Sequence, residues 1–478
     1  MRTVLLVVAG LLLTGCEVGP DYVKPTTEVP ANWTELHVTE AQARETLERQ
    51  KLWWQEFHDP ILDRLVAEAL DGNIDLQMAR QRLISARAAR VVAGAADYPQ
   101  IGAAALGSLS NSSTTLQYPP GNGQYRTYAA GFDATWELDI FGGTKRAKEA
   151  ADDDVDATIE QRRATLVSLL SEIATDYAIL RADQQRIDLA NSNLKIARQA
   201  LDLTTTEFSR GLTTSLAVAQ AQAQVQTVEA AVPPLRAEVA EQTHAIAVLL
   251  GQPPGQLEAE LLVPRPTIPA PPELPLSLPS EVIANRPDIR AAERRFGAAT
   301  ARIGVAVAQR YPHFSIPLTL MPTTSFLSTA FEGASLVWSA GLTVSQSVYD
   351  GGKLSARERE ARAEAEVSRL AYQQTVLNAF RDVEDAIVRY ASEAQRSASL
   401  RSAVAFDRTA VDRAQQLYAA GLTDFLNVLS TERALTSAED QQALAGLSRI
   451  RQVIALYKAI GGGWQSVNFA DETQAGAP

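Results

Sequence analysis

Two pairs of segments in this chain alternate between apolar and polar residues, which is the period-two pattern of a half-exposed β-strand. In the clearest segment, residues 128–140, every second residue is apolar, and three of the residues between them are acidic: Asp133, Glu137 and Asp139. The other three segments lie near residues 101–110, 314–323 and 336–347. The pattern predicts about four strands, arranged as two hairpins.

A long segment without glycine or proline follows each predicted hairpin, at residues 145–207 and 354–420. Its apolar residues recur at alternating steps of three and four, as in a coiled-coil seam, so each segment predicts a helix of roughly 95–100 Å with antiparallel neighbours. A turn at Gly211 or Gly421 then leads into an alanine-rich returning helix. The first returning helix must break or kink at Pro233-Pro234, whereas the second has no such interruption.

These elements belong to an internal duplication. Tyr98-Pro99 recurs as Tyr311-Pro312, an offset of 213 residues, and Gly142-Gly143 recurs as Gly351-Gly352, an offset of 209. The apolar stripe of the long helix keeps an offset of 210. Each copy is predicted to consist of a helix, two strands, a long helix and a shorter helix.

The rest of the layout follows from composition. The first helix of the first copy is expected to be continuous from about Ile61 to Ala96. Nine prolines between residues 253 and 279 predict an extended linker. The predicted parts are a signal peptide (1–15), a lipid-anchored extended segment (16–60), the first repeat (61–251), the proline-rich linker (252–279), the second repeat (280–463) and a C-terminal tail (464–478).

The N-terminal residues have the layout of a secretion signal. Arg2 precedes an apolar run from Val4 to Leu13, which is too short to span a bilayer as a helix. The run ends in Leu13-Thr14-Gly15-Cys16, which matches the bacterial lipoprotein box, so Cys16 is the predicted site of lipidation. Glu17 follows it instead of the aspartate that retains lipoproteins in the inner membrane, which points to the outer membrane. The alternative is an ordinary signal peptide with a chance cysteine.

Composition argues against an enzyme and against a nucleic-acid partner. The net charge is −12 and the pI is about 5.1, which disfavours nucleic-acid binding. The chain has no P-loop, dinucleotide fingerprint or nucleophile elbow. None of its four histidines has metal-ligand spacing: His37, His58, His244 and His313. We predict no catalytic residue, no metal site and no cofactor.

The two hairpins allow two interpretations. They could be soluble caps on a coiled-coil scaffold, but an isolated hairpin is only marginally stable in water. Their length, aromatic residues and apolar and polar faces suit a membrane barrel. Four strands cannot close a barrel, so spanning strands would require several copies of the chain, and three copies would supply twelve strands.

The chain resembles the TolC-like outer-membrane factors of tripartite efflux systems, in the lipoprotein branch. The resemblance covers nearly the whole mature chain. The motifs that carry it are Leu13-Thr14-Gly15-Cys16, Trp53-Trp54 with Phe57, Asp59-Pro60 and Leu62, Asn73 with Asp75-Leu76, Arg286-Pro287-Asp288-Ile289-Arg290-Ala291-Ala292-Glu293, and the two Gly-Leu turns.

This resemblance implies an α+β membrane protein that forms a homotrimer, with a twelve-stranded β-barrel in the outer membrane and a twelve-helix periplasmic α-barrel. The channel would conduct drugs, metals or similar small solutes passively to the exterior, with outer-membrane lipid, a periplasmic adaptor protein and an inner-membrane pump as partners. The alternatives are a lipid-anchored periplasmic scaffold without a pore, an exit duct for secreted proteins, and an envelope hydrolase, for which the sequence offers no catalytic set.

The resemblance also assigns site residues. Adaptor hairpins would dock at the two turns, whose residues are Arg210, Gly211, Leu212, Thr213, Gly421, Leu422 and Thr423. The same glycines could simply supply positive φ. The periplasmic mouth would lie at Ala217, Asn427 and Ser430, which are uncharged where family members often carry acids, and at Leu426, which matches a position that often forms an apolar constriction. We therefore expect closure by packing and neutral hydrogen bonds. The strand pattern itself places Asp133, Glu137 and Asp139 on the polar face of residues 128–140. If that face lines the lumen, these acids either make it negative or are merely solvated.

Overall fold

The computed structural model describes residues 17–26, 28–34, 38–113, 115, 123–263, 274–275, 277–329, 332–467 and 469. The predicted signal peptide, Cys16 and residues 470–478 of the predicted tail lie outside this part of the chain, as do residues 264–273 of the linker.

The chain folds into two compact units, each built from segments of both repeats. Unit 1 comprises Met1–Thr26, Arg82–Ile159 and Ala291–Gln373, and unit 2 comprises Thr27–Gln81, Glu160–Arg290 and Gln374–Pro478. The two predicted long helices are confirmed as α5 (Gly143–Ser209) and α11 (Lys353–Ala419), each 67 residues long. Each of these helices contributes residues to both units.

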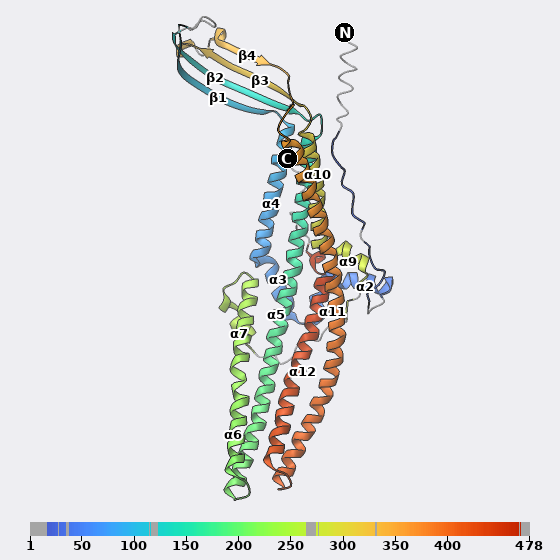
Figure 1. Cartoon of the computed structure of the whole chain (residues 1–478). Coiled ribbons are helices and arrows are strands. Elements are labelled where there is room, and N and C mark those ends of the chain that lie inside the picture. Colours follow the sequence, from blue (N-terminus) through green and yellow to red (C-terminus); the bar gives the residue numbers. More distant parts are fainter. Residues whose placement is uncertain are drawn as a thin grey trace. The chain divides into compact units, whose positions relative to one another are not determined.

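Unit 1 contains one antiparallel sheet (Figure 1). Its strands follow the order β1 (Gln100–Ser112), β2 (Gly123–Leu138), β3 (His313–Thr324) and β4 (Leu336–Ala340). The predicted fourth strand is divided, since β5 (Thr343–Ser345) pairs with β3 separately. The reason lies in the neighbouring strand: the position opposite Gly341 is Pro317, which has no N–H to donate to the ladder.

The two faces of the sheet differ in chemistry. One cross-strand row joins Ala103, Phe132, Leu320 and Trp338, and the adjacent row on the opposite face joins Gly102, Asp133, Thr319 and Ser339. β1 pairs only with β2, and β4 and β5 pair only with β3, within the described residues. The sheet therefore has an apolar face, a polar face and two unpaired edges.

The prediction of one continuous helix over residues 61–96 is wrong. This segment forms two helices, α3 (Pro60–Gly72) and α4 (Ile74–Gly94), separated by Asn73 in an extended conformation. The Asn73 amide donates to the carbonyl of Leu249 (2.8 Å) and its carbonyl oxygen accepts from the N–H of Leu76 (2.9 Å). The hydrogen bond to Leu249, at the end of α7 (Val232–Leu249), therefore stabilises the interruption between α3 and α4. The second repeat breaks at Arg286, before Pro287, between α9 (Pro279–Asn285) and α10 (Pro287–Ala308).

The returning helices agree with prediction. The first is interrupted at Ala231 between α6 (Ser215–Ala230) and α7 (Val232–Leu249), and α12 (Phe425–Ala459) is continuous. No helix in the described ranges combines the length and the apolar character needed to cross a lipid bilayer.

Two segments expected to be extended are partly helical. Pro254–Leu257 forms a 3₁₀ turn and α8 (Glu258–Leu261) follows, because residues 255–263 contain no proline and Pro254 lies in the first turn, where it is tolerated. In the N-terminal segment, α2 (Glu40–Arg49) and a 3₁₀ helix (Gln50–Phe57) replace the extended chain. Residues 17–26 and 28–34 contain no helix or strand.

An aromatic cluster forms part of the core of unit 2. Trp53 is fully buried and stacks on Tyr457, with ring centroids 5.1 Å apart. The rings of Trp54 and Phe57 meet the ring of Trp53 edge to face. The 3₁₀ helix that carries these three residues therefore packs onto α12.

Candidate functional site at the two helical turns

Both long helices end in the same backbone turn, and Figure 1 shows the α5–α6 and α11–α12 turns at one end of unit 2. Gly211 and Gly421 have φ of +77° and +70°. The N–H of Leu212 donates to the carbonyl of Glu207, and the N–H of Leu422 donates to that of Leu417, both at 2.9 Å. These bonds define Schellman caps, which satisfy carbonyls left free at a helix end and require the left-handed conformation that glycine provides.

The two turns expose leucines. Leu212 and Leu422 are 70% and 74% exposed, and Leu216 and Leu426 are exposed in the first turn of the following helices. The predicted tip residues Arg210 and Thr213 lie beside Leu212, and Thr423 lies beside Leu422. The turns therefore carry the predicted tip residues in an accessible arrangement. Exposed apolar side chains grouped in this way are characteristic of docking surfaces.

The helix that follows each turn starts differently. The Thr214 hydroxyl accepts a hydrogen bond from the N–H of Ala217 (3.4 Å) and caps α6. Asp424 occupies the same position before α12, but its side chain makes no capping hydrogen bond.

A groove of about 740 Å³ separates the two turns. Its walls come from α5, α6, α11 and α12, and include Leu212, Leu216 and Leu426. At its floor the rings of Tyr418 and Phe425 meet edge to face at 5.6 Å. The groove is thus lined mainly by small and apolar residues.

The structure separates the predicted mouth residues into two groups. Ala217 is only 7% exposed and packs in a cluster with Ala221, Tyr418, Phe425, Val428 and Leu429. Ala217 is therefore part of the core between the two helix pairs, and its role at the mouth stays a prediction. Leu426, Asn427 and Ser430 are exposed. The Asn427 amide donates to the Thr423 hydroxyl (2.7 Å), and the Ser430 hydroxyl donates to the Asn427 carbonyl (2.9 Å).

Sequence reasoning missed the polar contacts that join the helices of unit 2. Buried Glu439 on α12 accepts from Arg408 on α11 (2.8 Å) and from the Asn193 amide on α5 (3.0 Å). Asp440 accepts from Arg186 on α5 (2.7 Å). The partners lie 31 to 254 residues apart, so no local spacing identifies them.

Glu432, on α12, is a buried carboxylate without a cation. Gln415 donates to its Oε1 at 3.1 Å, and Oε2 has no hydrogen-bond partner within the described chain. Burial raises the pKa of this carboxyl, and the hydrogen bond from Gln415 offsets the effect only in part. The ionised form therefore destabilises the packing between α11 and α12.

We expect Glu432→Gln to increase the free energy of unfolding at pH 8 by about 1 kcal/mol. Because the folded-state pKa is raised, the wild type loses stability as the pH increases above 4.5, the ordinary value of this carboxyl, and the variant should not show that loss. Denaturant titrations followed by circular dichroism at several pH values measure both effects. Glu439→Gln is the matched control and should lower stability, because it leaves Arg408 partly unpaired.

The three predicted lumen acids have different surroundings in unit 1. Asp133 lies on the polar face of β2 beside Thr319. Glu137 pairs with His313 on β3 at 2.7 Å, and Asp139, beyond the end of β2, accepts from the N–H of Lys145 at 2.9 Å. No group of three or more histidine, cysteine, aspartate or glutamate side chains suited to a metal ion occurs in the described residues.

Comparison with known proteins gives consistent results. Residues 65–252 and 278–462 match the model of the family described as outer membrane efflux protein. The chain is 31% identical over 464 residues to nodulation protein T of Rhizobium leguminosarum bv. trifolii, covering 96% of each protein. It is also 31% identical over 464 residues to the cation efflux system protein CusC of Escherichia coli O6:H1, covering 95% of this chain and 97% of that protein. The structure of the outer-membrane channel OprN superposes with a TM-score of 0.86 at 36% identity, over 94% of this chain and 100% of that one.

Proposed function

The chain belongs to the outer membrane efflux protein family, as its sequence predicted, and we propose that it is the outer-membrane channel subunit of a tripartite efflux pump. It would conduct small solutes passively from the pump assembly to the exterior and catalyse no reaction. The observation that carries this proposal is the sheet of unit 1, with one apolar face, one polar face and two unpaired edges.

Unpaired edges cannot lie in lipid, where every backbone N–H and C=O needs a partner. Since neighbouring strands are antiparallel throughout, the β1 edge of one copy can pair antiparallel with the β4–β5 edge of the next. Four strand positions per copy make a closed cylinder of twelve strands in a homotrimer, and eight is the smallest number found in outer-membrane barrels. The apolar rows would then face lipid, and Asp133 and Glu137 would face the lumen.

The two turns supply the second element of the proposal. Leu212 lines the groove between the turns, and Leu422 is exposed on the second turn. This surface suits the helical hairpin of a periplasmic adaptor, which would link this channel to an inner-membrane pump. The neutral residues Leu426, Asn427 and Ser430 would form the mouth. Cys16 would carry the lipid that anchors the chain in the outer membrane, with the helices in the periplasm. The cargo would be metals, drugs or similar solutes.

We expect the double variant Leu212→Asp, Leu422→Asp to reduce export at least about tenfold. Each leucine that becomes buried on docking would contribute roughly 1.5–3 kcal/mol to the binding free energy, and 1.4 kcal/mol is a factor of ten in affinity. Accumulation of a fluorescent efflux substrate is measured in cells that express the chain together with a periplasmic adaptor and an inner-membrane pump with which the wild-type chain supports export. Val248→Asp, also exposed but on α7, is the control and should export normally. Normal export by the double variant would contradict docking at the turns.

A further inference from the structure

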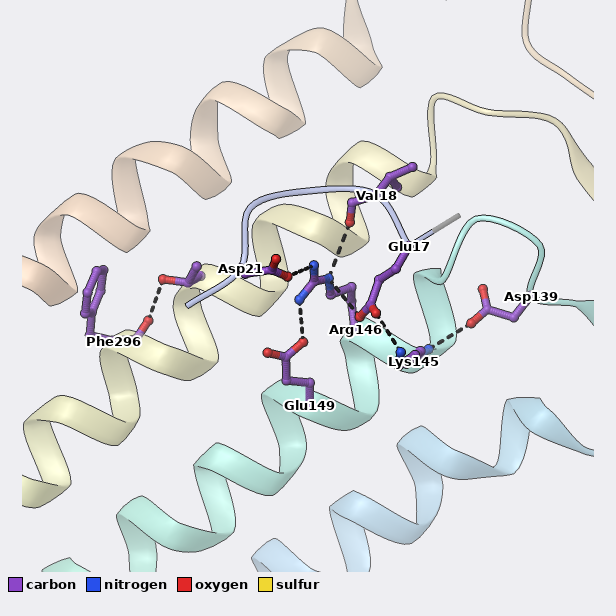
Figure 2. A network of polar contacts seen from close by, with 9 residues as sticks. Glu17, Val18, Asp21, Asp139, Lys145, Arg146, Glu149 and Phe296 are labelled. Atoms are coloured by element: carbon purple, nitrogen blue, oxygen red, sulfur yellow. Dashed lines mark hydrogen bonds and ion pairs between the residues drawn. The ribbon is translucent and has the colours of Figure 1, made fainter. Parts of the chain in front are cut away.

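A buried arginine in unit 1 is neutralised by residues from the beginning of the chain. The Arg146 side chain is 4% exposed and forms ion pairs with Asp21 (2.6 Å), Glu149 (2.7 Å) and Glu17 (3.2 Å). Its Nε also donates to the carbonyl of Val18 (3.4 Å), and Figure 2 shows Arg146 at the centre of this network. Burial opposes the charge, but the hydrogen bonds with Asp21 and Glu149 outweigh it and raise the pKa of Arg146. Two of the three neutralising carboxylates come from residues 17–21.

The same N-terminal residues contact the turn between β2 and α5. The Lys145 ammonium pairs with Glu17 at 2.6 Å, and the N–H of Val18 donates to the carbonyl of Phe141 at 3.3 Å. Gly142 has φ of +75°, and a Cβ there would lie 3.1 Å from the Cα of Glu17. The turn is therefore shaped to admit the N-terminal segment at close range.

A second set of contacts ties this segment to α10. Gly19 has φ of +99° and passes so close to Gly304 that a Cβ on Gly19 would lie 2.4 Å from the Cα of Gly304. Further along, the ring of Tyr22 meets that of Phe296 edge to face at 5.5 Å. Lys24 pairs with Glu293 at 3.0 Å. The segment thus crosses both α5, which follows β2, and α10, which precedes β3.

The duplication provides an internal comparison for this site. At the offset of 209 residues, Gly351-Gly352 corresponds to Gly142-Gly143, but Leu354 and Ser355 stand where the first repeat has Lys145 and Arg146. A Cβ on Gly351 would have no neighbour within 4 Å in the described chain. The second turn therefore has no cation at the two positions equivalent to Lys145 and Arg146, and no segment in the described chain approaches Gly351 as Glu17 approaches Gly142.

We propose that residues Glu17–Asp21 form an N-terminal strap with its own binding site, centred on Arg146 of the first repeat. The strap holds the N-terminal end of the processed chain at the β2–α5 turn and braces the two connections, β2–α5 and α10–β3, that join the helices to the sheet. This role rests on the proposed function. If Cys16 carries a lipid anchor, a strap held at this turn fixes the depth of that anchor relative to the sheet.

Amide hydrogen exchange of the full-length protein, purified from membranes in detergent, tests the strap at the N–H of Val18. We expect protection in the wild type and an increase in the exchange rate of about tenfold or more in Arg146→Met. The double variant Glu17→Gln, Asp21→Asn should have a similar effect and leaves the sequence of α5 unaltered. It therefore provides the test if Arg146→Met fails to fold. Lys148→Met is the matched control, because the Lys148 side chain lies on the same helix, is 42% exposed and pairs with Asp97 rather than with the strap, and it should change exchange by less than about threefold.

An unprotected Val18 N–H in the wild type, or exchange unchanged in both Arg146→Met and the double variant, would overturn the proposal. An effect of Lys148→Met as large as that of Arg146→Met would overturn the assignment of the strap's binding site to Arg146. The intact mass of the same sample separates this result from the proposed function. A protected Val18 on a chain without acyl groups would support the strap and contradict the lipid anchor, whereas an acylated chain with unprotected Val18 would contradict the strap alone.

Discussion

Replacing Phe132 by arginine is expected to prevent assembly of the trimeric channel. Phe132 is 59% exposed on the apolar face of the sheet, between Ala103 and Leu320 on the adjacent strands. If three copies close the sheet into a barrel, this side chain faces lipid. An arginine near the middle of a lipid-facing strand costs about 2–4 kcal/mol in each copy.

Native mass spectrometry of the detergent-extracted protein measures the outcome: a trimer for the wild type, and monomers or no extractable membrane protein for Phe132→Arg. Thr135→Arg is the matched control, because Thr135 lies on the polar face of the same strand and should retain the trimer. A wild-type level of trimer with Phe132→Arg would show that this face does not meet lipid. The scaffold without a pore would then be the better interpretation.

Replacing Trp53 by alanine should lower the free energy of unfolding by about 3–5 kcal/mol. Trp53 has no exposed surface and contacts three other rings, of which Tyr457 stacks on it. Truncation leaves a cavity between the 3₁₀ helix and α12 that these rigid rings cannot fill.

Denaturant unfolding followed by circular dichroism at 222 nm measures this loss, because unit 2 is largely helical. Leu52→Ala provides the control at the preceding residue, since Leu52 is 43% exposed and its truncation should cost less than about 1 kcal/mol. A cost below about 1 kcal/mol for Trp53→Ala would show that the aromatic cluster does not hold the 3₁₀ helix on α12.

The elements that were predicted correctly are those specified by local rules. The alternation around Phe132 places β2, and the absence of glycine and proline places α5 and α11, because strand and helix periodicity depend on neighbours a few residues away. The turns at Gly211 and Gly421 were found for the same reason, since a left-handed cap favours glycine.

The elements that were missed depend on distant partners. Asn73 interrupts the first helix while bound to Leu249, and β4 and β5 are separated where Pro317 lies on the neighbouring strand. At the candidate site, the burial of Ala217 follows from packing against residues of α12. The burial of Glu432 without a neighbouring cation likewise becomes evident only when α11 and α12 are packed together.

By itself, the sequence of this protein determined the long helices, most of the strands, the duplication, the position of the turns and the family, because periodicity, turn residues and ordered motifs are local properties of the chain. Only the tertiary structure decided which charges meet. Arg146 lies 125 residues from Asp21, and its equivalent in the second repeat is a serine, so nothing in its own segment marks it as a binding site. The cost of burying a charge makes such a residue depend on its partners, and only the fold brings those partners together.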